Sequence, residues 1–287
     1  LSARTPEALA QMAQDLAGEL QAKPSLKLAD LAPSANLGRT GFRHRSVCLA
    51  PDKDQLLSQL QALASDRSPL PDGVTRATAS RRPGKLAWLF TGQGSQSLGM
   101  GRELLEHPTF RDAFERVGAR LEPQLETPLR DLFVPQPGDE AQSATHLNQT
   151  GATQPALFAV GYALSQLWHS WGVRPDLLMG HSIGEVLAAH VAGVFSLDDA
   201  CRLVAARGRL MQALPPTGGM VALLAPLERV QAFMARHPAM RVAAYNGPAH
   251  TVVAGPSPAL RQLLAEAEGA GLHARQPHER EELRHAS

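Results

Sequence analysis

Apolar and polar positions near the start of the chain follow the periods of helices and a strand. Residues 5–20 place leucine and methionine side chains three or four positions apart, as on one face of a helix. An extended run follows at 44–49, and a second helical pattern covers 53–63. Residues 65–82 are rich in Ser, Pro, Gly and Arg, the composition of a connector. The pattern predicts a small α/β domain over residues 1–84.

A second region alternates short apolar runs with helical patterns. Buried strands are predicted at residues 85–90 and 176–179, where compact apolar runs end in glycine-containing loops. Helical patterns occupy 102–121, 154–168 and 185–192. Strands that alternate with helices favour a mostly parallel sheet, so we expect a larger α/β domain over residues 85–216.

The order of predicted strands and helices changes after Pro215-Pro216. The pattern that follows is strand, helix, strand, strand, helix, at 220–224, 227–236, 241–244, 251–254 and 258–268. This βαββα order is one strand short of a ferredoxin-like unit. It predicts a small subdomain over residues 217–276 and a return segment toward the larger domain over 277–287.

Composition excludes several classes of protein. Of 287 residues, 44% are apolar and 19% charged, with a formal net charge of +1, which is globular composition without the positive field that nucleic-acid binding needs. No apolar run approaches the roughly 18 residues of a membrane span, and no secretory leader opens the chain, so we expect a cytoplasmic protein. The chain begins at Leu1 without Met, which suggests a piece of a longer polypeptide.

The two cysteines are Cys48 and Cys201, which are far apart and lack CxxC spacing. They support neither a disulfide framework nor a zinc site, and we expect both to be small core residues and no metal to be bound.

Residues 180–184 match G-x-S-x-G, a sharp turn from strand to helix that exposes a serine hydroxyl. An apolar strand precedes the motif and an alanine-rich helix follows it, which is the context that the motif requires. Ser182 is therefore a candidate nucleophile, with the amide of Ile183 as a candidate oxyanion donor. The alternative is an ordinary serine N-cap on a core helix.

The loop 92–96 follows a strand and precedes a helix, but its spacing does not fit a phosphate-binding loop. G-x-G-x-x-G needs glycine at position 97, which is Ser97, and no GKS or GKT follows. The loop remains a glycine-rich turn at the carboxyl end of a strand, where open α/β sheets place their sites. Gln93 is accordingly a candidate second oxyanion donor.

Arg207 lies on the apolar face of a predicted helix. At about 100° per residue it falls within the stripe of Ala200, Val204 and Met211, whereas Arg202 and Arg209 fall on the opposite face. A guanidinium that points inward needs an anion. The anion is either an internal Asp or Glu, or a substrate carboxylate held in bidentate fashion.

A serine nucleophile also needs a base within hydrogen-bond reach. His181 adjoins Ser182, yet in such a turn its side chain should project away from the serine oxygen. His190 is expected on a helix face, and the remaining candidates are His250, His273, His278 and His285 near the end of the chain. We assign no base among them.

Four ordered motifs carry a family likeness: FTGQGSQ at 90–96, TQPALFA at 153–159, GHSIGE at 180–185 and RGRLMQ at 207–212. The chain resembles the acyltransferase domain of modular polyketide synthases, which is related to malonyl-CoA:acyl carrier protein transacylases. Residues 1–84, with LSARTP at 1–6 and GFRHR at 41–45, resemble the linker between a ketosynthase and its acyltransferase. The resemblance implies a hydrolase-like parallel α/β core with an inserted ferredoxin-like subdomain.

The resemblance also implies roles for the candidate residues. Ser182 would take an acyl group from coenzyme A, the amides of Gln93 and Ile183 would form the oxyanion hole, and Arg207 would hold the free carboxylate of the extender. His181 and Asn246, the latter at the inner edge of the insert, are candidate pocket residues. Ile183 after the serine, with TQPA upstream, is similar to the malonyl-loading pattern.

The implied substrate is malonyl-CoA, and the implied partners are an adjacent ketosynthase and the phosphopantetheine arm of an acyl carrier protein, with no bound cofactor, nucleic acid or membrane. The chain departs from the family at its end. Relatives place a catalytic histidine in a His-Ala-Phe-His-Ser type motif after the insert, and this chain ends at LRHAS. We therefore expect the base beyond Ser287 and a C-terminally truncated core. Two alternatives stay open: a serine esterase or thioesterase, for which G-x-S-x-G is equally expected, and a non-catalytic scaffold fragment.

Overall fold

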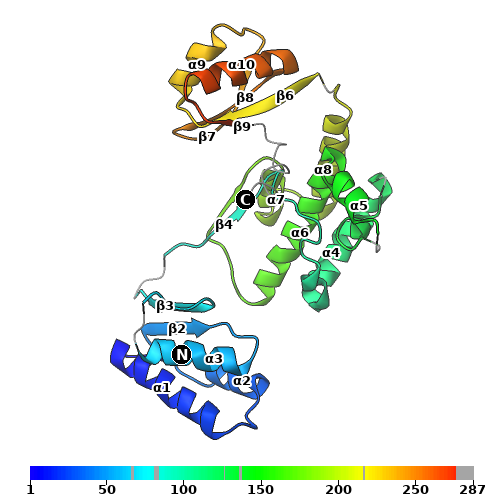
Figure 1. Ribbon diagram of the computed structural model, residues 1–287. Helices are drawn as coiled ribbons and strands as arrows, with labels where there is room; N and C mark the ends of the chain where they lie inside the picture. The colour runs from blue at the N-terminus through cyan, green and yellow to red at the C-terminus, as the bar shows by residue number, and fades with distance from the viewer. Residues whose placement is uncertain (66–67, 81–83, 126, 136–137, 216, 276–287) are drawn as a thin grey trace. The chain divides into compact units, whose positions relative to one another are not determined.

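The computed structural model describes residues 1–65, 68–80, 84–125, 127–135, 138–215 and 217–275 (Figure 1). It divides the chain into two compact units, Leu1–Lys85 and Leu86–Ser287. The return segment predicted at 277–287 lies outside the described residues. None of the described helices is both long enough and apolar enough to cross a membrane.

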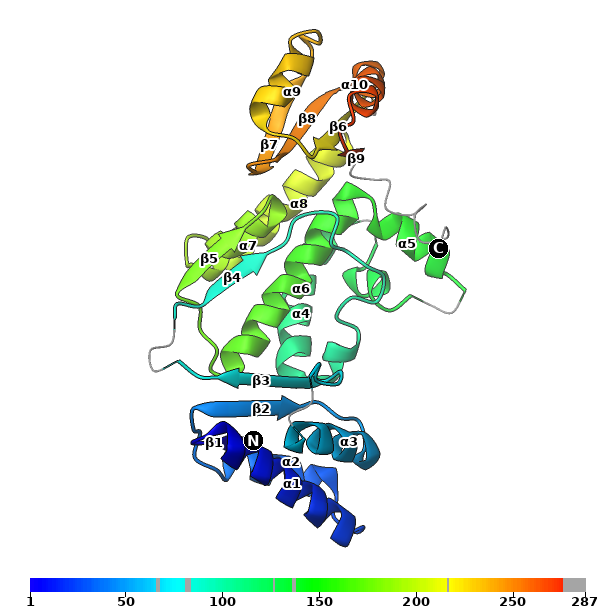
Figure 2. The same cartoon turned by 60° about the vertical axis from the view of Figure 1, so that its left-hand side comes forward.

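The first unit is an antiparallel sheet of three strands with helices packed on one face (Figure 2). Its strands are β1 (Ser2–Ala3), β2 (His44–Cys48) and β3 (Val74–Thr78), in that order across the sheet, and its helices are α1 (Pro6–Ala22), α2 (Leu28–Leu37) and α3 (Lys53–Ala64). Helix α1 begins where predicted, because Thr5 Oγ1 accepts a hydrogen bond from the Ala8 amide at 3.2 Å. Helices α1 and α3 share a core in which Ala13, Leu60 and Leu63 are buried.

Two expectations for this unit are wrong. The connector predicted at 65–82 contains β3, which pairs along its whole length with β2, from Val74 opposite Cys48 to Thr78 opposite His44. The side chains of β3 are exposed or half-buried, so backbone pairing holds a strand that has no apolar pattern to predict it. Cys48 is half-buried rather than a core residue, whereas Cys201 is buried as expected.

In the second unit, a parallel pair of strands lies beside a set of packed helices. Strands β4 (Ala87–Phe90) and β5 (Leu177–Gly180) pair in register from Ala87 opposite Leu177 to Phe90 opposite Gly180. The longer helices are α4 (Pro108–Leu121), α6 (Thr150–Ser170), α7 (Ile183–Val191) and α8 (Leu197–Gln212). Shorter elements join them: η1 (Glu103–Glu106), η2 (Glu122–Gln124), η3 (Leu129–Leu132) and α5 (Glu140–Leu147). The predicted α/β class is confirmed.

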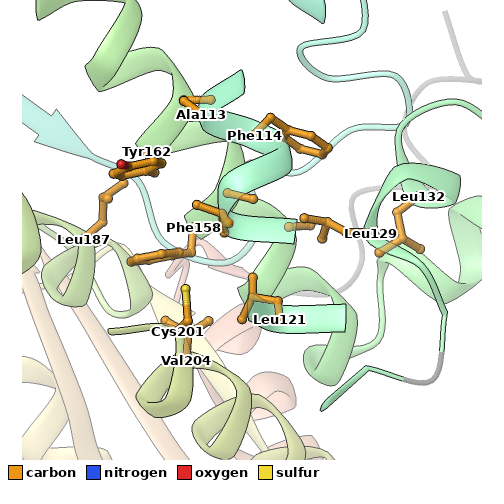
Figure 3. Close-up of a cluster of buried hydrophobic side chains, with 14 of the residues drawn as sticks. Ala113, Phe114, Leu121, Leu129, Leu132, Phe158, Tyr162, Leu187, Cys201 and Val204 are labelled. Atoms are coloured by element: carbon orange, nitrogen blue, oxygen red, sulfur yellow. The ribbon is translucent and has the colours of Figure 1, made fainter. Parts of the chain in front are cut away.

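Side chains from α4, α6, α7 and α8 form one hydrophobic core (Figure 3). Leu121, Phe158 and Val204 are each no more than 1% exposed within it. The single helix predicted at 102–121 is divided into η1 and α4, because Pro108 lacks an amide hydrogen and is suited to the first position of a new helix. The core fixes α6 and α8 side by side, with α7 packed against both.

The last described part of the second unit forms a four-stranded antiparallel sheet with two helices. Its elements are β6 (Gly218–Leu223), α9 (Leu227–Met234), β7 (Arg241–Gly247), β8 (His250–Pro256), α10 (Ser257–Gly269) and β9 (Ala274–Arg275). The strand order is β7-β8-β6-β9. The unit predicted to lack a strand thus has it, because β9 pairs with β6 and completes the βαββαβ order of a ferredoxin-like unit. A strand of two residues is too short to give a sequence pattern.

Candidate active site

The bend between β5 and α7 holds Ser182 in an unusual backbone conformation. Its φ is 55° and its ψ is −118°, and it is the only non-glycine residue with positive φ among those that the structure describes. Such a conformation costs about 1–3 kcal/mol and persists only where the surroundings impose it. Ser182 is at the N-cap position of α7, yet its side chain makes no capping hydrogen bond. The alternative of an ordinary N-cap serine is therefore wrong.

The two glycines of the motif are required by backbone packing at this bend. A Cβ atom on Gly180 would lie 2.1 Å from the carbonyl oxygen of Gly184, and one on Gly184 would lie 2.3 Å from that of Phe90. Either contact is far inside van der Waals distance, so any side chain at these positions would open the turn. The spacing G-x-S-x-G thus places the Ser182 hydroxyl at an exposed tip above the end of the sheet.

Arg207 reaches that tip from α8. Its Nη2 donates to Ser182 Oγ at 3.2 Å, and its Nη1 donates to Gln154 Oε1 at 2.6 Å. The predicted helix faces are confirmed for Ala200 and Val204, which are fully buried, for half-buried Arg207 and for Arg202, which is exposed in an ion pair with Asp199; Met211, predicted on the apolar stripe, is 39% exposed. Among the described residues no carboxylate lies within ion-pair distance of Arg207. The hypothesis that an internal Asp or Glu pairs with Arg207 is therefore wrong for the described part of the chain.

Gln154 is a site residue to which the sequence alone assigned no role. Its side chain is 1% exposed, its Oε1 accepts from Arg207, and its Nε2 lies 3.3 Å from Met211 Sδ. A neutral amide orients the guanidinium without cancelling its charge, so the cation stays available to an anion. The position of Gln154 on α6, in the TQPA motif, was the available signal.

The loop after β4 approaches the bend closely. Gly92 is buried, and a Cβ atom on it would lie 2.6 Å from His181 Nδ1 and 3.2 Å from Ser182 Cβ. Gln93 follows directly, and Ile183, whose side chain is 1% exposed, is the first residue of α7. Within the described ranges, the backbone amides of Gln93 and Ile183 have no hydrogen-bond acceptor. Two amides without an acceptor in these ranges therefore belong to the two segments that meet at the serine.

Neither His181 nor His190 is placed to act as the base for Ser182. The His181 amide donates to the Phe90 carbonyl at 3.0 Å and its exposed ring adjoins Gly92, while the recorded partner of Ser182 Oγ is Arg207. His190 Nδ1 lies 3.0 Å from the Phe195 carbonyl oxygen, and its ring packs against Phe158 and Tyr162, so it has a structural role.

The other candidates lie elsewhere. His250 and His273 belong to the antiparallel part of the chain, and His278 and His285 lie outside the described residues. Asn246 is exposed on β7, beside an irregularity in the strand register, and no contact with Ser182 or Arg207 is recorded for it in the described part of the chain.

The cation beside Ser182 is the guanidinium of Arg207. The described residues contain no group of three or more His, Cys, Asp or Glu that could hold a metal ion. Burial raises the pKa of the Cys201 thiol to about 11, so this thiol is protonated and unreactive at neutral pH. The arrangement therefore offers one hydroxyl, two amides and one guanidinium.

Comparison with known proteins gives a consistent result. The family model for the acyl transferase domain matches residues 87–278, and a model named CurL-like, PKS C-terminal, matches residues 1–60. The chain is 47% identical over 265 residues to the spectinabilin polyketide synthase system protein NorB of Streptomyces orinoci, covering 92% of this chain and 12% of that protein. It therefore spans a small part of the length of this curated relative.

Solved structures agree with the sequence match. The acyltransferase domain from module 8 of the salinomycin polyketide synthase superposes with a TM-score of 0.84 at 34% identity, over 96% of this chain and 64% of that one. The malonyl CoA-acyl carrier protein transacylase of Clostridium perfringens gives a TM-score of 0.57 at 30% identity, over 67% of this chain and 60% of that one.

Proposed function

The chain belongs to the acyltransferase domain family of polyketide synthases, and from this premise we propose that it transfers a malonyl unit from coenzyme A to a carrier protein through an acyl-serine. The observation that carries the proposal is the position of Arg207, whose guanidinium lies between Ser182 Oγ and the neutral amide of Gln154. The similarity to a malonyl CoA-acyl carrier protein transacylase supports the choice of a malonyl unit.

In the first step, Ser182 Oγ attacks the thioester carbonyl carbon. A C–O bond forms, the C–S bond breaks, and the proton of the hydroxyl passes through a base to the leaving thiolate of coenzyme A. The developing oxyanion would be stabilised by the free amides of Gln93 and Ile183. In the second step, the phosphopantetheine thiol of the carrier attacks the serine ester, so the acyl group moves on and the hydroxyl is restored.

Arg207 would select the substrate. A malonyl group carries a carboxylate one carbon away from its thioester carbonyl, so a cation beside the nucleophile is within its reach. We expect the carboxylate to replace Ser182 Oγ as an acceptor from Arg207, forming a bidentate pair while Gln154 keeps the guanidinium in place. A serine esterase that acts on neutral esters has no use for such a cation.

The general base is the component that the described residues do not supply. No described imidazole contacts Ser182 Oγ, and we propose that a histidine beyond Ser287 acts as the base. An adjacent ketosynthase and a carrier protein are likewise proposed as partners. The match of residues 1–60 to a polyketide synthase model supports this proposal. Neither a metal nor a bound cofactor enters the proposed steps.

The test is intact-protein mass spectrometry, after incubation with malonyl-CoA, of a chain extended past Ser287 so that it includes the proposed base. We expect one malonyl ester on the unsubstituted chain and none on Ser182→Ala, because no other nucleophile is proposed. An adduct that persists on the variant would move the nucleophile elsewhere. No adduct on either protein would contradict the proposal and favour the scaffold alternative.

A further inference from the structure

Three polar side chains, two near the N-terminus of α6 and one just before it, contact the two sides of the site. Asn148 and Thr150 contact the loop that carries Gln93, and Gln154, one turn further on, contacts Arg207. These contacts join residues that are more than 50 positions apart in the chain. This short segment thus contacts both the loop that carries the Gln93 amide and the guanidinium that donates to Ser182.

On the loop side, two side chains hold the backbone. Gln93 Nε2 donates to Thr150 Oγ1 at 3.2 Å. Gln96 Nε2 donates to Asn148 Oδ1 at 2.9 Å, and Gln96 Oε1 accepts from the Gly94 amide at 2.7 Å. Because a peptide unit can rotate when its neighbours are free, tethering the side chain of Gln93 and the amide of Gly94 restricts the direction of the Gln93 amide.

On the arginine side, close helix packing sets the distance. Gly151 and Gly208 face each other, and a Cβ atom on Gly208 would lie 3.4 Å from Gly151 Cα. The Gly151 amide also donates to Gln212 Oε1 at 3.3 Å. The first turn of α6 therefore lies directly against α8, and this contact brings Gln154 within 2.6 Å of Arg207.

We propose that the N-terminal part of α6, with Asn148 just before it, positions the two halves of the site separately: Thr150, with Asn148, aims the Gln93 amide at the reacting carbonyl, and Gln154 aims Arg207 at the acyl carboxylate. This inference rests on the proposed function. Thr150 is a positioning residue that acts through Gln93, so its loss should affect every acyl group equally. The loss of Gln154 should affect only acyl groups that carry a carboxylate.

The test compares Thr150→Val with Thr150→Ser, Gln154→Met and the control Thr145→Val in the full chain. Thr145 is exposed on α5, and its hydroxyl donates to the Ala141 carbonyl of its own helix. For acylation of Ser182 by malonyl-CoA and by acetyl-CoA, we expect Thr150→Val to lower kcat by about 3- to 10-fold for both, with unchanged KM, as for loss of one hydrogen bond. Thr150→Ser should restore the rate, and Thr145→Val should not change it.

Gln154→Met should instead lower the ratio of malonyl to acetyl loading.

A double-mutant cycle tests whether Thr150 acts through the side chain of Gln93, because Gln93→Ala removes that side chain and keeps the backbone amide. Thr150→Val should add nothing in the Gln93→Ala background. An additive loss there, or a change in the malonyl-to-acetyl ratio with Thr150→Val, overturns the inference.

A second measurement does not depend on catalysis. Amide hydrogen exchange at residues 92–96 should be faster in Thr150→Val than in the unsubstituted chain or in Thr145→Val. If the unsubstituted chain forms no acyl-serine, the proposed function fails, and exchange still decides the positioning role. Equal exchange in all three proteins overturns that role even where acylation is observed.

Discussion

The bend between β5 and α7 and the helix pair α6–α8 meet at the hydroxyl of Ser182, but they are held in shape by different groups. At the bend, backbone atoms pack against backbone atoms, with Gly180 against Gly184 and Gly184 against Phe90. Between the helices, the fixing contacts are side-chain hydrogen bonds, above all that from Arg207 to Gln154. The nucleophile is thus set by main-chain geometry and the anion-binding group by side chains.

This difference predicts what each region tolerates. Main-chain packing leaves no room for a side chain, so a substitution at the bend should cost folding stability before it affects selectivity. A half-exposed side chain on a helix can be changed without moving the backbone, so a substitution there should alter the choice of substrate and leave the fold intact. Measurements of folding stability and of substrate choice therefore distinguish the two regions.

The largest effect on stability is expected for Gly184→Ala. Its Cβ atom would lie 2.3 Å from the Phe90 carbonyl oxygen, which forces β4 and α7 apart. We expect the free energy of unfolding to fall by about 3 kcal/mol or more, measured by urea denaturation. Gly269→Ala is the matched control, since it lies at the end of α10 with no atom within 4 Å of its added Cβ. Equal urea midpoints for the two variants would refute main-chain packing as the constraint.

Arg207→Ala should show the opposite pattern. Losing the partner of a desolvated carboxylate costs about 2–4 kcal/mol, so malonyl loading should fall by roughly 30- to 1,000-fold, while acetyl loading changes far less. The urea midpoint should stay close to that of the unsubstituted chain. Arg202→Ala, on the exposed face of the same helix, is the control and should change neither rate. Equal losses for malonyl and acetyl groups would remove the role of Arg207 as a carboxylate clamp.

Sequence alone predicted the features that depend on local pattern. Glycine spacing around Ser182 predicted the bend, since the steric demand lies within five successive positions. Helical periodicity predicted that Arg207 turns inward, because the angle around a helix follows from residue number. The observed N-caps of α1 and α8, Thr5 and Ser196, are of the residue types that favour this position, and in each the side chain accepts a backbone hydrogen bond.

Sequence could not predict contacts between distant segments. Gln154 and Arg207 are 53 positions apart in the chain, and Gln93 and Thr150 are 57 positions apart. Neither pair leaves a local pattern in the sequence. Strands β3 and β9 were missed for a related reason, since each is held by pairing with a partner strand rather than by its own apolar residues. The residues that position the site belong to this second class.

The smallest effect expected concerns the shared core of the helix region. Cys201 is 1% exposed, and burial raises the pKa of its thiol from 9.0 to about 11. Between these two pH values the unfolded chain loses the Cys201 proton while the folded chain keeps it. The thiol's contribution to stability is therefore fully present below about pH 9 and is lost as the pH rises toward about 11.

Replacing this thiol by Cys201→Ala should make the fall in stability over that range shallower than in the unsubstituted chain, measured by urea denaturation at several pH values. Alkylation by iodoacetamide at pH 8 offers an internal control, because half-buried Cys48 should react while Cys201 reacts only after unfolding. Reaction of Cys201 at the rate of Cys48 in the folded protein would show that the core between α6 and α8 opens readily. In that case side-chain packing could not hold Gln154 and Arg207 in place, and the contrast with the bend would become sharper.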